Sequence, residues 1–378
     1  MTDRSIRTAL VSTNSVCQGE SVAVLWGPLF AEGVHIDFGY RTFIWDSEAT
    51  DKAHVHCVIV GFSKAMNTKP RIIYDGPEQA VAANINAYLV DAVNVFITGR
   101  NKPLSKIPAI GIGNMPVDNN QYLFDESEKE EFIKKEPVAE KYFHLWYGSR
   151  EFINRSPRYC LWLGDCTPAE LKKMPECMKR IQAVHDFRAS SKRAATAKAA
   201  DKPTRFMTEN MPKSNYIVVP KVSSERRRYI PMGFFTPDIF CSDLVFLIPD
   251  AILYHFGVLE SNVHMSWMRA VCGRLKSDYR YSKDIVYNNF PWPDPSPEQK
   301  EKIEKTAQGI LDARALYPDS SLADLYDPLT MPPELRKAHQ KNDAAVMQAY
   351  GMPIKDTDEA ACVAWLMKLY QEKVNNME

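Results

Sequence analysis

The sequence has no apolar run that approaches the ~18 residues of a membrane span, and no apolar segment follows its first four residues. We therefore expect no membrane anchor, no secretory signal and a cytoplasmic protein. Cysteine is also sparse, with eight in 378 residues, no CxxC pair, and Cys160 and Cys166 as the closest two. This spacing argues against a disulfide framework and favours reduced thiols.

Several motifs of enzyme chemistry are missing. The chain has no GxxxxGK[ST] loop, no GxSxG elbow, no HExxH pair and no EF-hand loop. Residues 111–113 (GIG) resemble the start of a dinucleotide-binding loop, but residues 114–116 (NMP) follow where a helix should begin. His54, His56 and Cys57 come closest to a metal-binding cluster. On a strand Cys57 points away from both histidines, so we expect no metal site.

The texture of the chain predicts three domains, at residues 1–98, 99–294 and 295–378. The fold class we expect is α/β plus α+β. In the first domain, residues 8–12 suit a buried parallel strand, and residues 20–30 suit a short helix with a wide apolar face, broken near its Gly-Pro pair. Two β-rich runs follow, joined by a polar stretch too short for a crossover. They should form an antiparallel hairpin.

The second region is irregular and rich in proline, aromatic and charged residues. Its patterns predict strands at residues 159–163, 216–220 and 244–248, and helices at residues 126–135 and within 168–193, the latter interrupted at Pro175. The third region is helical. Ser296 suits an N-cap followed by proline, and helical patterns run through Leu316 and recur at residues 333–350 and 356–373.

Charge is distributed unevenly although the total is zero, with 47 Lys and Arg against 47 Asp and Glu. Residues 179–228 hold thirteen basic and four acidic side chains, whereas residues 295–378 hold ten basic and fourteen acidic ones. Such a chain can present a basic face while its average is neutral. Basic side chains near aromatic residues suit contacts with phosphates and bases. The candidates for DNA contact are Arg226, Arg227, Arg228, Arg269, Arg274, Lys276, Arg280, Tyr281 and Lys283.

Long segments of the chain resemble one family. Residues 268–282 and 286–293 are similar to the end of the target recognition domain in large type IIG and IIL restriction–modification enzymes, in which an adenine-specific DNA methyltransferase and its recognition domain share one chain. Residues 159–163 and 223–231 resemble other parts of that domain. Residues 11–20, 43–49 and 53–62 resemble the rear of the methyltransferase domain, and the segment after Pro297 resembles the family's C-terminal helices.

The resemblance implies the rear half of a class I methyltransferase sheet, a recognition domain that binds duplex DNA, and a helical tail. The Gly-rich S-adenosylmethionine loop and the Asn/Asp-Pro-Pro-aromatic motif of the family do not occur. The chain alone is therefore expected to hold no cofactor and to be inactive, although S-adenosylmethionine is implied for the complete enzyme. The alternatives are one half of a split methyltransferase, active only with an upstream partner chain, and a non-catalytic remnant. The partners we expect besides DNA are such an upstream chain or a second copy of this chain in a homodimer.

A methyltransferase that acts on duplex DNA flips its target base out of the helix and stacks it on a side chain. In related enzymes this ring comes from the hairpin region, and the candidates here are Phe43, which we prefer, and Trp45. The alternative is that both rings fill the core of the sheet.

Overall fold

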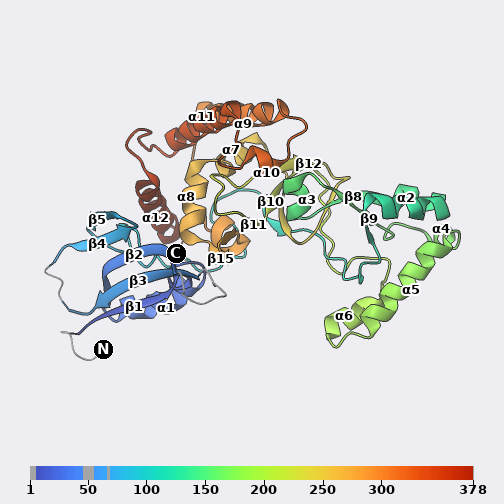
Figure 1. Ribbon diagram of the computed structural model, residues 1–378, viewed down its shortest axis with the longest axis horizontal. Helices are drawn as coiled ribbons and strands as arrows, with labels where there is room; N and C mark the ends of the chain where they lie inside the picture. Colours follow the sequence, from blue (N-terminus) through green and yellow to red (C-terminus); the bar gives the residue numbers. More distant parts are fainter. Residues whose placement is uncertain (1–5, 46–54, 66–68, 378) are drawn as a thin grey trace.

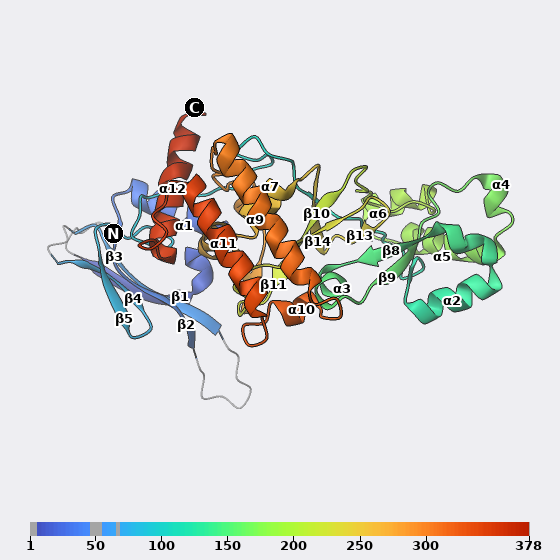
Figure 2. The same ribbon diagram turned by 90° about the horizontal axis from the view of Figure 1, so that it is seen from above.

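The computed structural model describes residues 6–45, 55–65 and 69–377. The molecule is elongated: an N-terminal sheet lies at one end, C-terminal helices lie over the middle, and a helical arm lies at the opposite end (Figures 1 and 2). The fold is mixed α/β, with four open sheets among the described residues. The main hydrophobic core is continuous from the N-terminal sheet through the recognition region into the C-terminal helices, while a second core fills the arm.

The N-terminal sheet has five strands in the order β1-β3-β2-β4-β5. Their bounds are Arg7–Thr13 (β1), His35–Trp45 (β2), Val55–Ser63 (β3), Arg71–Asp75 (β4) and Glu78–Ala82 (β5). β2 and β3 pair antiparallel, which confirms the predicted hairpin, although the residues between them lie outside the described residues. β2 pairs with β4 in parallel and β4 with β5 antiparallel. The register of the central hairpin shifts twice, and Tyr40 stacks on Tyr74 between neighbouring strands.

The first strand differs from its prediction. β1 pairs antiparallel with β3 along its whole length, and Leu10 and Val11 are each 54% exposed. Its apolar run predicts a buried, parallel central strand. In the described part of the chain β1 is instead an edge strand with β3 as its partner, and Leu10 and Val11, whose side chains point to opposite faces of the sheet, are both exposed.

The first helix also differs from its prediction. α1 (Ser21–Ala31) continues through Pro28 without a break, because the proline lies in the last turn and interrupts few helical hydrogen bonds. Its buried face is narrow: Val22 and Trp26 are buried, whereas Val24 is 78% exposed. The indole of Trp26 donates to the carbonyl of Val16 at 2.8 Å, which fixes α1 against the turn that follows β1.

The recognition region combines three small sheets, ordered β12-β10-β14-β6, β11-β16-β15 and β13-β8-β9-β7. The strands are Gly111–Ile112 (β6), Leu123–Phe124 (β7), Phe143–Tyr147 (β8), Arg158–Leu161 (β9), Tyr216–Pro220 (β10), Val222–Ser223 (β11), Gly233–Phe235 (β12), Phe240–Cys241 (β13), Val245–Pro249 (β14), Gly273–Leu275 (β15) and Asp278–Arg280 (β16). The predicted strands correspond to β9, β10 and β14. The short strands that the sequence patterns missed contain only two to five residues, too few for a periodic signal.

The helices of this region are Glu126–Lys135 (α2), Ser149–Asn154 (α3), Pro168–Leu171 (α4), Pro175–Ala189 (α5), Ala194–Lys198 (α6), Leu253–Leu259 (α7) and Asn262–Val271 (α8). The helix at residues 126–135 is confirmed, with Asp125 as its capping residue. The interruption at Pro175 is confirmed too, because α5 begins at this proline, which suits the first helical position.

The C-terminal helices are Pro297–Ala315 (α9), Leu322–Leu325 (α10), Pro333–Ala349 (α11) and Glu359–Asn375 (α12). Ser296 caps α9 as predicted, and its hydroxyl accepts from the backbone N–H of Gln299. α9 and α11 lie side by side in both views (Figures 1 and 2), and α9 packs on α7 while α12 packs on α8. The tail is therefore joined to the recognition region through a shared core.

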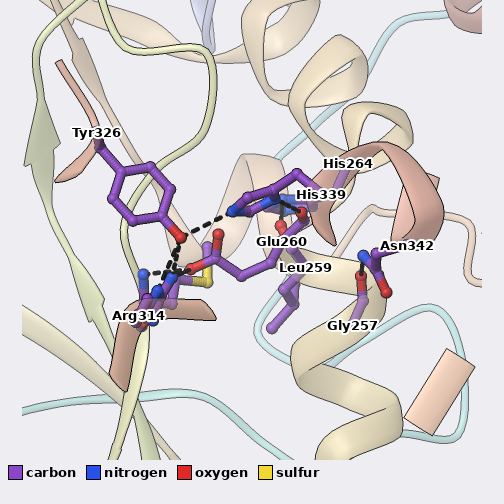
Figure 3. A network of polar contacts seen from close by, with 9 residues as sticks. Gly257, Leu259, Glu260, His264, Arg314, Tyr326, His339 and Asn342 are labelled. Carbon is purple, nitrogen blue, oxygen red and sulfur yellow. Dashed lines mark hydrogen bonds and ion pairs between the residues drawn. The ribbon is translucent and has the colours of Figure 1, made fainter. Parts of the chain in front are cut away.

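A buried polar network crosses this junction (Figure 3). Glu260, fully buried at the end of α7, accepts from Arg314 of α9 at 2.7 Å. The Nε of Arg314 also donates to the hydroxyl of Tyr326 at 2.8 Å, and that hydroxyl contacts Nε2 of His339 at 2.8 Å. Nδ1 of His339 lies 3.2 Å from the Glu260 carbonyl oxygen, which closes the loop. Burial and the nearby Arg314 charge lower the pKa of His339 well below its usual value.

Candidate nucleic-acid interface

Three of the predicted cations, Arg274, Lys276 and Arg280, lie on a short hairpin. β15 and β16 pair with Leu275 opposite Asp278, so the turn has two residues, and Lys276 in it has a φ of 57°. β16 also pairs with β11, which places Arg280 opposite Val222. The hairpin therefore brings the segment that leads to Arg226 beside the segment that contains Arg274.

Arg274 is fixed by several contacts. Its Nη1 lies 3.0 Å from a carboxylate oxygen of Glu225 and donates to the Ser277 carbonyl at 2.8 Å, while its guanidinium lies 4.2 Å from the centre of the Tyr279 ring. The same Glu225 oxygen is 3.9 Å from Nε2 of His56 on β3. Glu225 is thus an internal ion-pair partner, and it ties the hairpin to the N-terminal sheet.

Two of the predicted cations, Arg228 and Arg269, belong to segments that are in direct contact. Nη2 of Arg269 donates to the carbonyl of Arg228 at 2.7 Å, and its Nη1 pairs with Glu359 of α12 at 2.9 Å. Residues that are 41 positions apart in sequence are therefore in direct contact. Arg226 lies 3.7 Å from Asp327, so this pair connects the cluster with the C-terminal region.

The predicted cations differ in how accessible they are. Arg226, Arg228, Lys276 and Arg280 are exposed, so their charged groups face solvent. Burial lowers the pKa of the half-buried Arg227. Lys283 pairs with the neighbouring Asp284 at 2.5 Å.

Tyr281 does not lie on this surface. Its side chain is only 2% exposed, and its hydroxyl lies 3.0 Å from Nε2 of His264 in the core. The expectation that Tyr281 contacts DNA does not fit this position: Tyr281 follows the last residue of β16, and its ring is buried while the neighbouring Arg280 is exposed. Burial lowers the pKa of His264 to about 3, so its imidazole is neutral and acts as a packing residue in the core.

A cleft of about 430 Å³ separates the N-terminal sheet from the hairpin and α12. Asn14 and Gln18, in the turn after β1, line it together with Arg41, Arg269 and Glu359. Buried atoms of Asn14 (Nδ2) and Gln18 (Oε1) have no hydrogen-bond partner there. Sequence reasoning missed these residues, although ligands of α/β sheets often bind at the carboxyl ends of strands, and this turn follows such an end.

The two aromatic candidates lie at the end of β2. Phe43 is half-buried and packs edge-on against Tyr40 with ring centres 5.7 Å apart, whereas Trp45 is 51% exposed. Their ring centres are 6.4 Å apart. The alternative that both rings fill the core does not fit Trp45.

The described residues contain neither a metal site nor a membrane-spanning helix. Over residues 6–45, 55–65 and 69–377, no group of His, Cys, Asp and Glu side chains is arranged to hold a metal ion. His54, which the sequence analysis considered, lies outside the described residues. In the same part of the chain, no helix is long and apolar enough to cross a membrane.

Comparisons with known proteins cover nearly the whole chain. Three family models match: the MmeI DNA-methyltransferase domain at residues 1–75, the MmeI target recognition domain at residues 91–294 and the MmeI C-terminal domain at residues 295–378. The chain is 42% identical over 366 residues to DNA methyltransferase A of Bacillus subtilis (strain 168), covering 97% of this chain and 41% of that protein.

A solved structure of the type IIL restriction–modification enzyme MmeI in complex with DNA has a similar fold. Its TM-score is 0.90 at 44% identity, covering 99% of this chain and 50% of that one. The chain thus spans about half the length of the relatives it matches, and the resemblance to type IIG and IIL enzymes is confirmed. It belongs to the MmeI family of restriction–modification DNA methyltransferases, of which it carries the target recognition domain, the C-terminal domain and a matched part of the methyltransferase domain.

Proposed function

We propose that this chain recognises a specific sequence in duplex DNA, as part of an adenine-N6 DNA methyltransferase of a restriction–modification system. The observation that carries the proposal is the contact between the two arginine segments, at Arg228 and Arg269, inside the matched target recognition domain. The DNA-bound state of the related MmeI structure supports the same partner.

The cations divide between two roles in this proposal. Arg226, Arg228 and Arg280 are exposed and would hold phosphates or read base edges in the grooves. Arg269 and Arg274 are positioning residues, because each already binds a carboxylate and a backbone carbonyl that fix the surrounding segments.

We extend the proposal to base stacking at the end of β2. Trp45 is better placed than Phe43 to receive an extrahelical base. More than half of the Trp45 side chain is accessible, whereas the Phe43 ring packs against Tyr40. A base stacked on an aromatic ring contributes about 1–3 kcal/mol of binding free energy.

S-adenosylmethionine, which the family implies, does not fit the residues present. The sequence has no Gly-rich loop, and the cleft beside the carboxyl end of β1 is lined by ion-paired side chains such as Arg41 with Asp75 and Arg269 with Glu359. No step of the proposal runs through the cofactor.

Fluorescence anisotropy with a labelled duplex library, at salt concentrations between about 50 and 300 mM, tests DNA binding. The log of the binding constant should fall with the log of salt by about 0.9 for each neutralised phosphate. Replacing Arg226, Arg228 and Arg280 by glutamine should lower this slope by up to about 2.7. The matched control replaces three exposed cations of α11, Arg336, Lys337 and Lys341, by glutamine and should leave the slope unchanged. Absence of salt-dependent binding to any duplex would refute the proposal.

A second candidate is that the chain forms one half of a split methyltransferase with an upstream partner chain. The edge of β1 that has no partner strand in the described part of the chain favours it. Leu10 and Val11 are exposed there, and β3, an antiparallel strand, lies between β1 and β2 as in the rear half of a class I methyltransferase sheet. Unpaired edges are usually covered by another strand or chain.

Mixing this chain with the product of the reading frame upstream, if that product carries the Gly-rich and Asn-Pro-Pro-aromatic motifs, tests the split enzyme. Methyl transfer to unmethylated DNA should require both chains. Failure to form a complex, or a complex without methyl transfer, would favour a homodimer or a non-catalytic remnant. Light scattering distinguishes these two by the molar mass of the chain in solution.

A further inference from the structure

Much of the basic stretch at residues 179–228 lies far from the interface described above. Its first half forms α5, α6 and a 3-10 turn at Ala199–Asp201. These elements belong to the helical arm opposite the N-terminal sheet, in which α4 lies farthest out and α6 lies at the other end of α5, nearer the middle of the molecule (Figures 1 and 2). α6 and the turn pack back against α5, so they form a compact tip.

One cation of this stretch holds the tip in place. Arg188, on the last turn of α5, is only 1% exposed. Its guanidinium donates to five backbone carbonyls, those of Pro116, Val117, Ala199, Lys202 and Arg205, at 2.7–3.1 Å. Two of these carbonyls belong to a distant segment, so Arg188 ties the tip to the body of the arm. Because the Arg188 guanidinium is buried and donates to these carbonyls, it does not reach a binding partner.

The remaining cations of the tip are free to act on a partner. Lys192, Arg193, Lys198 and Lys202 are all exposed and fall within eleven residues of sequence. Within the described ranges, none of the four has an ion pair. Asp201 is the one acidic residue between positions 190 and 204. Because Arg188 holds this segment in one conformation, its excess of positive charge is preorganised to bind a polyanion.

We propose that the tip of the arm, defined by Lys192, Arg193, Lys198 and Lys202, is a second DNA-contact surface that binds the phosphate backbone of the duplex away from the recognised sequence. This inference rests on the proposed function. Three of the four cations are lysines, and contacts from such side chains to phosphates carry no sequence information, so we expect the contribution of the tip to be the same on specific and random duplexes. Its role is to raise affinity and to fix the orientation of the duplex.

The test uses the full chain with the four tip cations replaced by glutamine. The matched control changes the same residue types, Lys305, Arg336, Lys337 and Lys341, which are exposed on α9 and α11. For each phosphate that the variant no longer neutralises, the salt slope should fall by about 0.9, and affinity near 0.15 M salt should fall about fivefold. The slope of the tip variant should fall by about 1.8 or more on specific and random duplexes alike, and that of the control should stay unchanged.

A second measurement needs only the wild-type chain. Lysine acetylation followed by mass spectrometry should show Lys192, Lys198 and Lys202 protected when a long duplex is bound, and Lys305 unprotected. If the wild-type chain binds duplex DNA but the tip variant keeps its slope, or the tip lysines stay reactive, the inference is overturned. If the wild-type chain binds no duplex, the proposed function itself fails, so the two failures are distinguishable.

Discussion

The ion pair between Glu260 and Arg314 is predicted to hold the C-terminal helices on the recognition region. Glu260 is fully buried, and its Oε1 also accepts from the backbone N–H of Met232 at 2.6 Å. Replacing Glu260 by glutamine keeps the shape but leaves the Arg314 charge without its partner. Breaking a buried pair from one side costs about 3–5 kcal/mol, more than about a hundredfold in the folding equilibrium.

Urea unfolding followed by circular dichroism measures this loss of unfolding free energy. Hydrogen exchange of the backbone amides of α11 shows whether the C-terminal helices are the part that is destabilised. E260Q and R314M should each lose about 3 kcal/mol or more, and the double variant should lose less than their sum by at least about 1 kcal/mol. Arg336→Gln, an exposed change on α11, is the control. Single variants that lose less than about 1 kcal/mol, or fully additive losses, would refute the reasoning.

Three further predictions concern other parts of the molecule. Arg188→Gln should make the arm sensitive to limited proteolysis near residue 200. It should also lower the free energy of unfolding by about 3 kcal/mol or more, because buried carbonyls lose a charged donor. An unchanged cleavage pattern would contradict this role of Arg188. For His264, burial lowers the folded pKa to about 3 against about 6.5 unfolded, so the unfolded chain binds the proton first and stability falls as pH drops below about 6.5. Between about pH 6.5 and 5 the wild type should lose about 1.6 kcal/mol of unfolding free energy relative to H264Q, measured by urea unfolding; parallel pH profiles would exclude this source. Trp45→Ala should weaken binding of a duplex with an extrahelical adenine by about 1 kcal/mol or more in anisotropy, with Phe187→Ala, an exposed ring on the arm, as the control.

Local sequence signals predicted several elements well because they depend on neighbouring residues. Ser296 followed by proline placed the start of α9, and Pro175 placed the start of α5. The hairpin of β2 and β3 followed from the length of its connection. The family resemblance likewise came from continuous segments, and the matched domain models confirm it.

Pairing and exposure were harder to predict because they depend on partners distant in sequence. An apolar run such as β1 has the same pattern whether it is central or at an edge, so its antiparallel pairing and its exposed Leu10 did not follow from residues 8–12. The cleft beside Asn14 could not be predicted either, because Arg269 and Glu359, which complete it, come from segments far from Asn14 in the sequence.

The amino-acid sequence alone was enough to identify the family, the positions of most longer helices and the uneven distribution of charge. It could not assign a role to each cation, because charge is a property of a residue whereas accessibility is a property of the fold. Tertiary structure buried Arg188 against five carbonyls, engaged Arg274 with Glu225 and turned Tyr281 into the core. It also left Arg228 and the cations of the tip in solvent, where a phosphate can reach them.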